Sequence, residues 1–512
     1  MRRRAVRREP RKTNRVKSFI AALALAVSLP VATASEQQKR DEFFWLGEIN
    51  KASAVINTDE GLLDKTVAQR VAAGVAQVIR QGNEPGGKRP GTVISFEPLM
   101  IAAAGEDVTL LHAGRSSQDM HATYRAAILR DDMLNLADAL NKAAGTLIRL
   151  AEKHVSTVVP NYTNGVAAQP NSYGHYLLGH AAGLDRDAQR IREAYVRIDR
   201  SAMGTSVLNG TSWPLNRQRM ADYLGFSALV DNAYDASQIS SMDEPVEVGA
   251  VVAGIALHIG NFVQDLMTQY AQPRPWILLQ EGGDNTYVSS AMPQKRNPGL
   301  LNDTRSEAST AITLSLGPML QTHNITPGMP DPKSAKANSA MVNSAVKALN
   351  SWDRALKALV IKPDRALEEL NSDWTASEEL ADVLMRKYKL PFRVGHHFAS
   401  NVVEYARDKD IKPLDFPYAQ AQRIYAETVK NSKYPQALPM SEAEFRSTLD
   451  PVAIVRNRET VGGPQPAEMQ RMLKLASDRL AQQDQWIKAR REHINSSLAR
   501  LDQDFEKLLT KQ

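Results

Sequence analysis

One stretch of the chain gathers two hydroxyls, a lysine and an asparagine within nine residues: Ser289-Ser290-Ala291-Met292-Pro293-Gln294-Lys295-Arg296-Asn297. It follows the glycine-bearing run Glu281-Gly282-Gly283-Asp284, which predicts a mobile loop. A serine can act as a base only where water is excluded and dipoles or a cation stabilise its alkoxide. Lys295 stands six residues after Ser289. The loop therefore has the parts for proton abstraction, although an ordinary polar surface loop could have the same composition.

Two further segments carry polar groups that a helix end or a turn could aim. Residues 112–119, His-Ala-Gly-Arg-Ser-Ser-Gln-Asp, come just before a long helix that we expect from about His121. Hydroxyls and an amide at a helix N-terminus suit a carboxylate anion, and plain helix capping is the alternative. Residues 161–170 read Asn-Tyr-Thr-Asn-Gly-Val-Ala-Ala-Gln-Pro. We call these segment one (112–119) and segment two (161–170), and the serine-bearing stretch segment three (289–298).

Long helices must position these segments. No proline occurs between Asn171 and Trp213 or between Val246 and Gln272, and apolar residues recur at spacings of three and four elsewhere, as at Leu134, Ala137, Leu140, Ala144, Leu147 and Leu150. This pattern predicts an all-α protein with a long central helical bundle and smaller N- and C-terminal helical domains. We expect an N-terminal domain over 35–120, the bundle over 121–362, and a C-terminal domain with an amphipathic tail helix over 363–512.

Composition narrows the classes of function. The chain has no cysteine, which excludes disulfides and thiolate metal sites. Its net charge of +6 comes from residues 1–17, which carry nine basic side chains and one acid, so the rest has a net charge of −2. Beyond these first residues, nothing in the charge balance indicates nucleic-acid binding.

The first 34 residues have the layout of a signal peptide. The basic start is followed by an apolar run over 19–29, then by Pro30 and the small-residue site Ala32-Thr33-Ala34. We expect cleavage after Ala34, export by the general secretory route to the periplasm, and no membrane contact in the mature form. A misplaced start codon ahead of a cytosolic enzyme is the alternative.

Segment three resembles the signature S-S-x-M-P-x-K-x-N of the aspartase–fumarase–argininosuccinate lyase superfamily, with Val288 where a glycine usually precedes the serines. The resemblance extends over roughly residues 41–475. It implies that Ser289 is the general base, that Lys295 stabilises negative charge on the substrate carboxylate, and that Asn297 binds substrate. Ser290 and Met292 belong to the same binding loop. It also implies a homotetramer whose active sites each take the three segments from different subunits.

The other two segments match the same superfamily with changes. Segment one resembles the argininosuccinate lyase pattern H-T-G-R-S-R-N-D, with Ser117 and Gln118 replacing an arginine and an asparagine. Segment two resembles Y-T-H-L-Q-x-A-Q-P, where Asn164 replaces the histidine, while the glutamate that pairs with this histidine is Asn302 here. Matched loss of both partners predicts a rebuilt contact, since two amides can bond each other, or a coincidence. The resemblance implies substrate binding by the following residues of the two segments: Arg115, Ser116, Ser117, Gln118, Thr163, Asn164 and Gln169.

The overall layout resembles argininosuccinate lyase, but its arginine pocket has no clear counterpart. Residues 206–217 and the Val461-Gly462-Gly463-Pro464 stretch fit that branch. The two stretches that would hold the arginine moiety, residues 237–241 and 328–336, do not match its patterns S-D-R-D and Y-N-R-D-L-Q-x-D-K.

The resemblance therefore implies a lyase that eliminates fumarate from an N-substituted aspartate, a small dicarboxylate substrate, by breaking a C–N bond. No metal or organic cofactor is implied, because the base, the cation and the anion pocket suffice. Two alternatives stay open: genuine argininosuccinate lyase, and a non-catalytic binding protein on the same scaffold. The sequence does not indicate the leaving amine or the direction of the reaction.

Overall fold

The computed structural model describes residues 39–510 of the chain. From Arg40 onward the chain forms one compact unit. The expected signal peptide lies outside the described residues, as do the two C-terminal residues. Long helices dominate and the strands are short, so the all-α class predicted from the sequence is confirmed.

The helices and the helical turns follow one another along the chain from α1 to α16. They are α1 (Glu42–Asp59), α2 (Lys65–Asn83), α3 (Val93–Ala104), η1 (Glu106–His112), α4 (Ser117–Lys153), α5 (Tyr173–Ile198), α6 (Arg217–Tyr223), η2 (Asp235–Ile239), α7 (Ser240–Tyr270), α8 (Gly299–Thr322), α9 (Ala335–Ala358), α10 (Pro363–Ser372), α11 (Glu378–Tyr388), α12 (Phe392–Asp408), η3 (Pro413–Asp415), α13 (Tyr418–Val429), α14 (Glu442–Ser447), α15 (Pro451–Arg456) and α16 (Pro466–Thr510).

Within residues 39–510, the strands form four separate two-stranded sheets. The antiparallel pairs are β1 (Val158–Thr163) with β2 (Val166–Ser172), β5 (Ile277–Leu279) with β8 (Leu359–Ile361), and β6 (Tyr287–Val288) with β7 (Arg296–Asn297). The parallel pair is β3 (Arg200–Ser201) with β4 (Ala228–Leu229). None of these sheets is large enough to form a core of its own, so they serve as local braces between helices.

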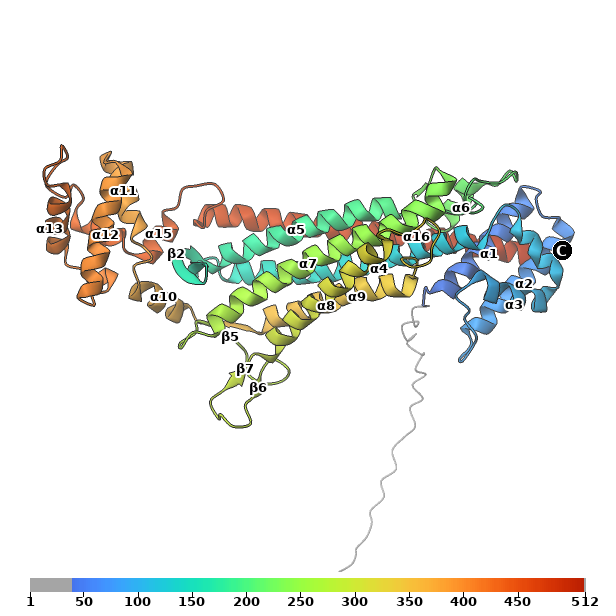
Figure 1. Ribbon diagram of the computed structural model, residues 1–512, viewed down its shortest axis with the longest axis horizontal. Coiled ribbons are helices and arrows are strands. Elements are labelled where there is room, and N and C mark those ends of the chain that lie inside the picture. The colour runs from blue at the N-terminus through green and yellow to red at the C-terminus, as the bar shows by residue number, and fades with distance from the viewer. Residues whose placement is uncertain (1–38, 511–512) are drawn as a thin grey trace, which may run out of the picture. The chain divides into compact units, whose positions relative to one another are not determined.

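Five long helices form the central bundle: α4, α5, α7, α8 and α9 lie side by side (Figure 1). Helix α4 carries the apolar period expected from the sequence, and its Leu134, Ala137, Leu140 and Leu147 are all buried. It begins with a capping box: the Ser116 side chain accepts a hydrogen bond from the backbone of Asp119, and the Asp119 side chain accepts one from the backbone amide of Ser116. This cap fixes the point at which segment one ends and the bundle begins.

Helix α7 is the most apolar element of the bundle. With η2 it is long and apolar enough, by length and composition, to cross a membrane, but half of its most apolar window is buried within the protein. It packs on α5, α8 and α9, as a core helix of a bundle does.

A buried arginine of α4 ties the end of α5 to the chain that follows α6. Arg130 of α4 is fully buried, pairs with Asp199 at 2.9 Å, and donates to the backbone oxygens of Gly225 (2.6 Å) and Leu224 (3.1 Å). Its guanidinium lies over the ring of Phe226, 4.3 Å from the centroid. Its charge is thus matched by a carboxylate and two carbonyls, which a buried cation requires.

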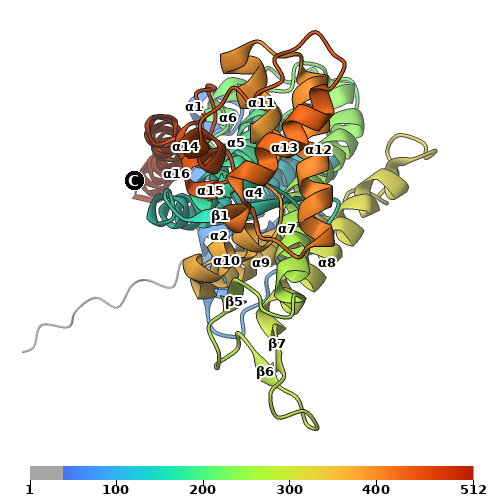
Figure 2. The ribbon, with the colours of Figure 1, turned by 90° about the vertical axis from the view of Figure 1, so that its left-hand side faces the viewer.

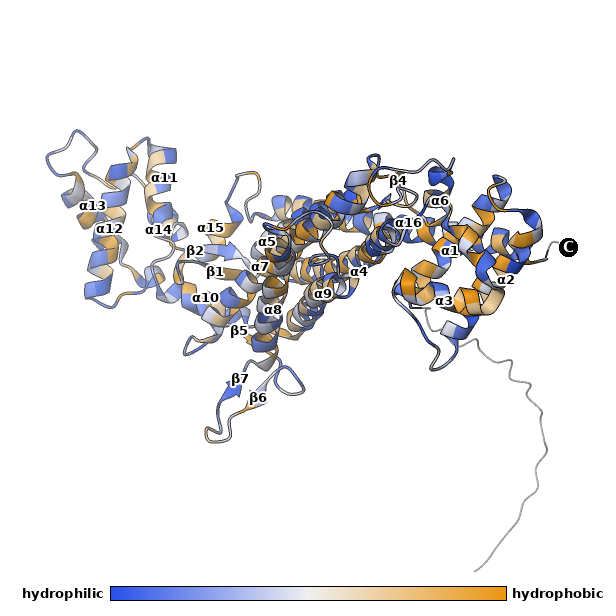
Figure 3. Ribbon diagram, turned by 45° about the vertical axis from the view of Figure 1, so that its right-hand side comes forward, coloured by the Kyte–Doolittle hydropathy of each residue, from blue (hydrophilic) through white to orange (hydrophobic). Residues whose placement is uncertain are grey.

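The C-terminal part contains a second core. Its buried residues run from Trp374 to Leu449 and come from α11, α12, α13, α14 (Figure 2) and the loops between them. The tail helix α16 contributes instead to the main core, through residues such as Leu473, Ile494 and Leu501. Figure 3 shows apolar and polar residues alternating along these helices, as expected for elements with one buried side. The domain limits expected from the sequence stay a prediction.

Candidate active site

Segment one is held at the N-terminus of α4 by Asp119. One carboxylate oxygen of Asp119 accepts from the backbone amides of Ser116 (2.8 Å) and Met120 (3.0 Å). The other accepts from the amides of Gly204 (3.0 Å) and Ser206 (3.1 Å). Burial raises the pKa of Asp119, while these amides favour its charged form. Asp119 therefore ties segment one to the loop after β3.

That loop is strained where Asp119 holds it. Ser206 and Val207 have φ values of 46° and 77°, in the left-handed region. A β-branched residue is seldom found there, and such outliers gather at functional sites. Sequence reasoning assigned Asp119 no role, although its spacing from Ser116 is that of a capping box and could have indicated it.

The polar side chains of segment one differ in burial and in the hydrogen bonds that they make within the chain. Arg115 is buried and donates to Asn50 (2.8 Å) and Ser53 (2.9 Å) of α1, and burial lowers its pKa to about 10. It therefore braces α1 against segment one. Ser116, Ser117 and Gln118 are half-buried. The Ser116 hydroxyl accepts from the Gln118 amide at 3.0 Å, as an N-cap does.

Segment two is a β-hairpin. The Asn164-Gly165 turn has positive φ at both residues, 53° and 76°, which is the backbone of the tight turn that favours this dipeptide. The structure thus gives Asn164 a conformational task at the tip, where it and Thr163 are exposed. Gln169 donates to Glu378 of α11. The hairpin therefore presents Thr163 and Asn164 outward and braces Gln169 against the C-terminal part.

Segment three is also a hairpin, formed by β6 and β7, and it projects from the bundle in both Figure 1 and Figure 2. The Ser289 hydroxyl accepts hydrogen bonds from the amides of Met292 (3.1 Å) and Ala291 (3.3 Å). Ser290, Met292 and Lys295 are exposed, and Asn297 donates to the Tyr287 carbonyl at 3.3 Å. Two amides aimed at one hydroxyl oxygen stabilise negative charge there, which lowers the cost of forming an alkoxide.

An arginine fixes the shape of this hairpin. Arg296 donates to the carbonyls of Pro293 (2.8 Å) and Lys295 (3.3 Å), and to the carboxylate of Glu281 (3.1 Å). The Lys295 carbonyl in turn accepts from the Ser289 amide at 3.4 Å. The loop from Ser289 to Lys295 is thus closed by its own backbone, although it stands in solvent.

Other candidate bases near these segments already have partners. The Nε2 atom of His121 accepts from the Val93 amide at 3.2 Å, and burial lowers the pKa of His121 to about 4. His112 contacts Glu97 closely. The Tyr162 hydroxyl donates to Glu369 and accepts from Trp276, and burial raises its pKa. His121 and Tyr162 therefore lack the free lone pair or the ready ionisation that a base requires near neutral pH.

The three segments do not meet within one chain. Segment one precedes α4 and segment two follows it, and 37 helical residues span about 55 Å. Segment three follows α7, which begins beside the loop after β3 and runs to the end where Trp276 meets Tyr162 (Figure 1). A site containing all three segments therefore needs more than one copy of the chain.

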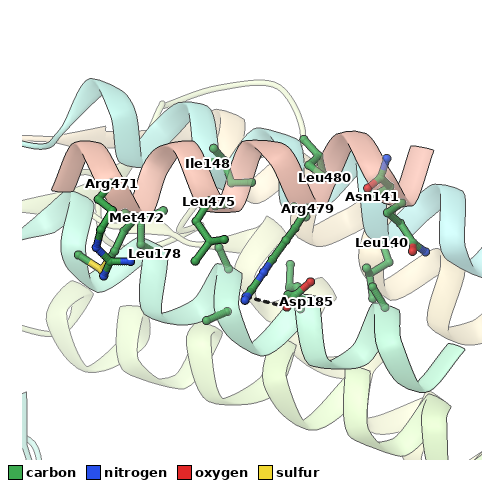
Figure 4. A pocket seen from close by; sticks show the side chains of 17 residues that line it. Leu140, Asn141, Ile148, Leu178, Asp185, Arg471, Met472, Leu475, Arg479 and Leu480 are labelled. Carbon is green, nitrogen blue, oxygen red and sulfur yellow. Dashed lines mark hydrogen bonds and ion pairs between the residues drawn. The ribbon is translucent and has the colours of Figure 1, made fainter. Parts of the chain in front are cut away.

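A cavity of about 270 Å³ lies elsewhere, between α4, α5 and α16 (Figure 4). Its walls are apolar, with Leu140, Leu178 and Leu475 among them, and the Arg479–Asp185 ion pair (2.9 Å) lies at one side. No predicted site residue lines it. Across residues 39–510, no group of three or more His, Cys, Asp or Glu side chains is placed to hold a metal ion.

Family models match most of the chain. The model described as "Lyase" matches residues 45–312, and the model described as "Argininosuccinate lyase C-terminal" matches residues 374–456. The chain is 28% identical over 466 residues to argininosuccinate lyase of Methanosarcina acetivorans, covering 88% of this chain and 90% of that protein. It is 27% identical over 460 residues to the enzyme of that name from Methanocaldococcus jannaschii, covering 87% and 90%.

Solved structures share the fold. An EDDS lyase variant with bound fumarate superposes with a TM-score of 0.82 at 23% identity, covering 91% of this chain and 92% of that one. The 3-carboxy-cis,cis-muconate lactonizing enzyme of Pseudomonas putida superposes with a TM-score of 0.60 at 18% identity, covering 87% and 96%. The resemblance found in segment three is thus confirmed along the chain, which belongs to the aspartase–fumarase–argininosuccinate lyase superfamily of lyases.

Proposed function

We propose that this protein eliminates fumarate from an N-substituted aspartate, releasing an amine. The observation that carries the proposal is the setting of the Ser289 hydroxyl on the projecting hairpin. This hydroxyl accepts hydrogen bonds from two backbone amides, and Lys295 follows six residues later. Its relatives named argininosuccinate lyase and the EDDS lyase fold point to the same class of C–N bond cleavage. Release of fumarate, followed by its ultraviolet absorbance over a panel of N-substituted aspartates, tests it.

The reaction needs a base, a fixed positive charge and an anion pocket. The Ser289 alkoxide takes a proton from the methylene carbon of the aspartate part. The carboxylate attached to that carbon becomes dianionic, and Lys295 and fixed donors stabilise it. The C–N bond then breaks, the nitrogen keeps the electron pair and takes up a proton, and fumarate remains. Ser116, Ser117, Gln118, Thr163, Asn164 and Asn297 serve as the donors that hold the carboxylates.

The active site proposed for this reaction is completed in a homotetramer. The segments lie far apart in one chain, so copies of the chain must pack together to complete a site. Helices α7 and α8 leave large apolar side chains exposed in the single chain, with Leu320 exposed by 75% and Leu257 by 54%. Exposed apolar faces of this kind mark protein interfaces. Sedimentation or light scattering gives the number of subunits.

Argininosuccinate should be a poor substrate. Residues 237–241 and 328–336 do not supply the arginine-side groups of that enzyme, and a guanidinium buried without partners costs several kcal/mol. We expect kcat/KM for argininosuccinate at least about tenfold below that for the best N-substituted aspartate. Equal or faster turnover of argininosuccinate would contradict this and favour the genuine argininosuccinate lyase reaction.

We also propose that the protein acts outside the cytosol, in the periplasm. The basic start, the apolar run and the Ala32-Thr33-Ala34 site support removal of a leader after Ala34. N-terminal sequencing of protein from an exporting host should begin at Ser35. A protein that keeps Met1 and stays in the cytosolic fraction would contradict the expectation.

A further inference from the structure

Two stretches that are far apart in the sequence meet beside segment one. Lys333, in the loop before α9, donates from Nζ to the Ser237 carbonyl (3.1 Å) and to Oε1 of Gln238 (3.4 Å). The Ser237 hydroxyl lies 3.5 Å from the Thr205 hydroxyl. Thr205 stands between Gly204 and Ser206, whose amides bond Asp119. The ammonium group of Lys333 is therefore linked by a short series of contacts to the N-terminus of α4.

Arg125 brings a second cation to this region. It follows Gln118 by seven residues on α4, so the two share a face of the helix and lie about 10 Å apart along its axis. Its Nε and Nη2 atoms are buried and have no hydrogen-bond partner among residues 39–510. Burial lowers the pKa of Arg125, and the fork of donors stays directed into the protein without an acceptor.

Neither cation has a carboxylate oxygen within 4.0 Å in the part of the chain that the structure describes. Neither Arg125 nor Lys333 forms an ion pair there. Burial lowers the pKa of Arg125, and the Tyr124 phenol and the Glu244 carboxyl act in the opposite direction. Burial raises the pKa of Glu244 to about 8. The pKa of Lys333 is lowered by burial and then by the charge of Arg125, so the two cations lie close enough to repel each other.

A pair of partly buried, unmatched cations next to a carboxylate-binding helix end calls for a second anion. We propose that Arg125 and Lys333 bind a carboxylate on the leaving amine, so that the substrates are N-(carboxyalkyl)aspartates and the released amine is an amino acid. This rests on the proposed function, and it names the substrate class. The elimination is unchanged: the carbon–hydrogen and carbon–nitrogen bonds of the aspartate part break, giving fumarate and an amino acid whose nitrogen has gained the proton.

The test compares two substrates of equal size that differ in one charge. N-(carboxymethyl)aspartate releases glycine, and its carboxamide analogue releases glycinamide. Glycinamide is the less basic amine and therefore the easier leaving group, so chemistry alone favours the amide. We expect the opposite order, with kcat/KM higher for the glycine substrate by about tenfold or more, as for a hydrogen-bonded charge.

Substitution of the two cations should abolish that preference. Lys333→Met should reduce the ratio of the two kcat/KM values about tenfold, chiefly through KM, and Arg125→Lys should reduce it partially because the charge remains without the fork. Lys409→Met removes an exposed lysine from the end of α12, outside residues 237–241 and 328–336, and should leave the ratio unchanged. Circular dichroism and subunit number confirm that each variant is folded and assembled.

The possible results separate the two proposals. Turnover of both substrates with no preference for the carboxylate, or a preference that survives Lys333→Met and Arg125→Lys, overturns this inference and leaves the lyase function standing. An equal fall with both substrates together with a lower subunit number overturns it as well, because the cations then pair with a neighbouring subunit. Absence of fumarate from every substrate overturns the proposed function, and this inference with it.

Discussion

Replacing Ser289 with alanine is expected to lower kcat by about a thousandfold or more, because the variant loses the group that takes the proton. Substrate binding should change little, since in the proposed site the carboxylates are held by Ser116, Gln118, Thr163 and Asn297. The loop itself should keep its shape, because Arg296 and the Lys295 carbonyl close it without the Ser289 hydroxyl. Steady-state kinetics on the best substrate, with circular dichroism of the variant, provides the measurement.

Two neighbouring substitutions act as controls for that experiment. Ser290→Ala should have a smaller effect, because no amide of residues 39–510 is directed at the Ser290 hydroxyl in the way that two are at Ser289. Lys295→Ala should weaken both KM and kcat, since its charge meets a carboxylate in the ground state and more charge in the transition state. If Ser289→Ala keeps more than about a tenth of the original kcat, another base is at work and the loop-serine mechanism is wrong.

Activity should return when two inactive variants are mixed. Ser289→Ala inactivates segment three, and a combined Ser116→Ala, Gln118→Ala variant inactivates segment one. If each site takes these segments from different subunits, random reassembly at equal amounts restores both in about one quarter of the sites. Starting from a thousandfold loss, this is a rise of about two orders of magnitude. The mixture is unfolded and refolded together, and fumarate release is compared with each variant treated alone.

The same mixing experiment includes a negative control. A single variant that holds Ser289→Ala, Ser116→Ala and Gln118→Ala should gain no activity when refolded with itself. In a mixture with the wild-type chain it should reduce the number of complete sites. If the tetramer forms in the mixture of single-segment variants but activity does not recover, each chain builds its site from its own segments.

The sequence predicted the bundle because its signal is repeated over many residues. The period at Leu134, Ala137, Leu140 and Leu147 is carried into the structure as one buried face of α4. The three segments were also found from the sequence, since the serine-lysine stretch and the helix cap have unusual residue types at fixed spacing. Their placement at the two ends of α4 and α7 follows from helix length alone.

Contacts between distant stretches could not be predicted in the same way. Nothing local shows that Lys333 reaches Ser237, because the contact depends on how α7 and the loop before α9 fold onto α4. The amides that bond Ser289 depend on loop geometry rather than on residue type. The hairpin of segment two could have been predicted, since Asn164-Gly165 is a strong turn signal. The sequence analysis instead treated Asn164 only as the replacement of a histidine.

If the active site is shared between subunits as proposed, the length of α4 makes the activity depend on protein concentration. One chain holds segments one and two about 55 Å apart, so on this proposal a dissociated subunit has no complete site even when it is fully folded. Specific activity should therefore fall steeply on dilution through the dissociation range, while the helical content of each chain stays the same. A chain that crosses a membrane unfolded and alone would thus be silent in the compartment where it is made, and would begin to turn over substrate only after enough copies had accumulated on the other side.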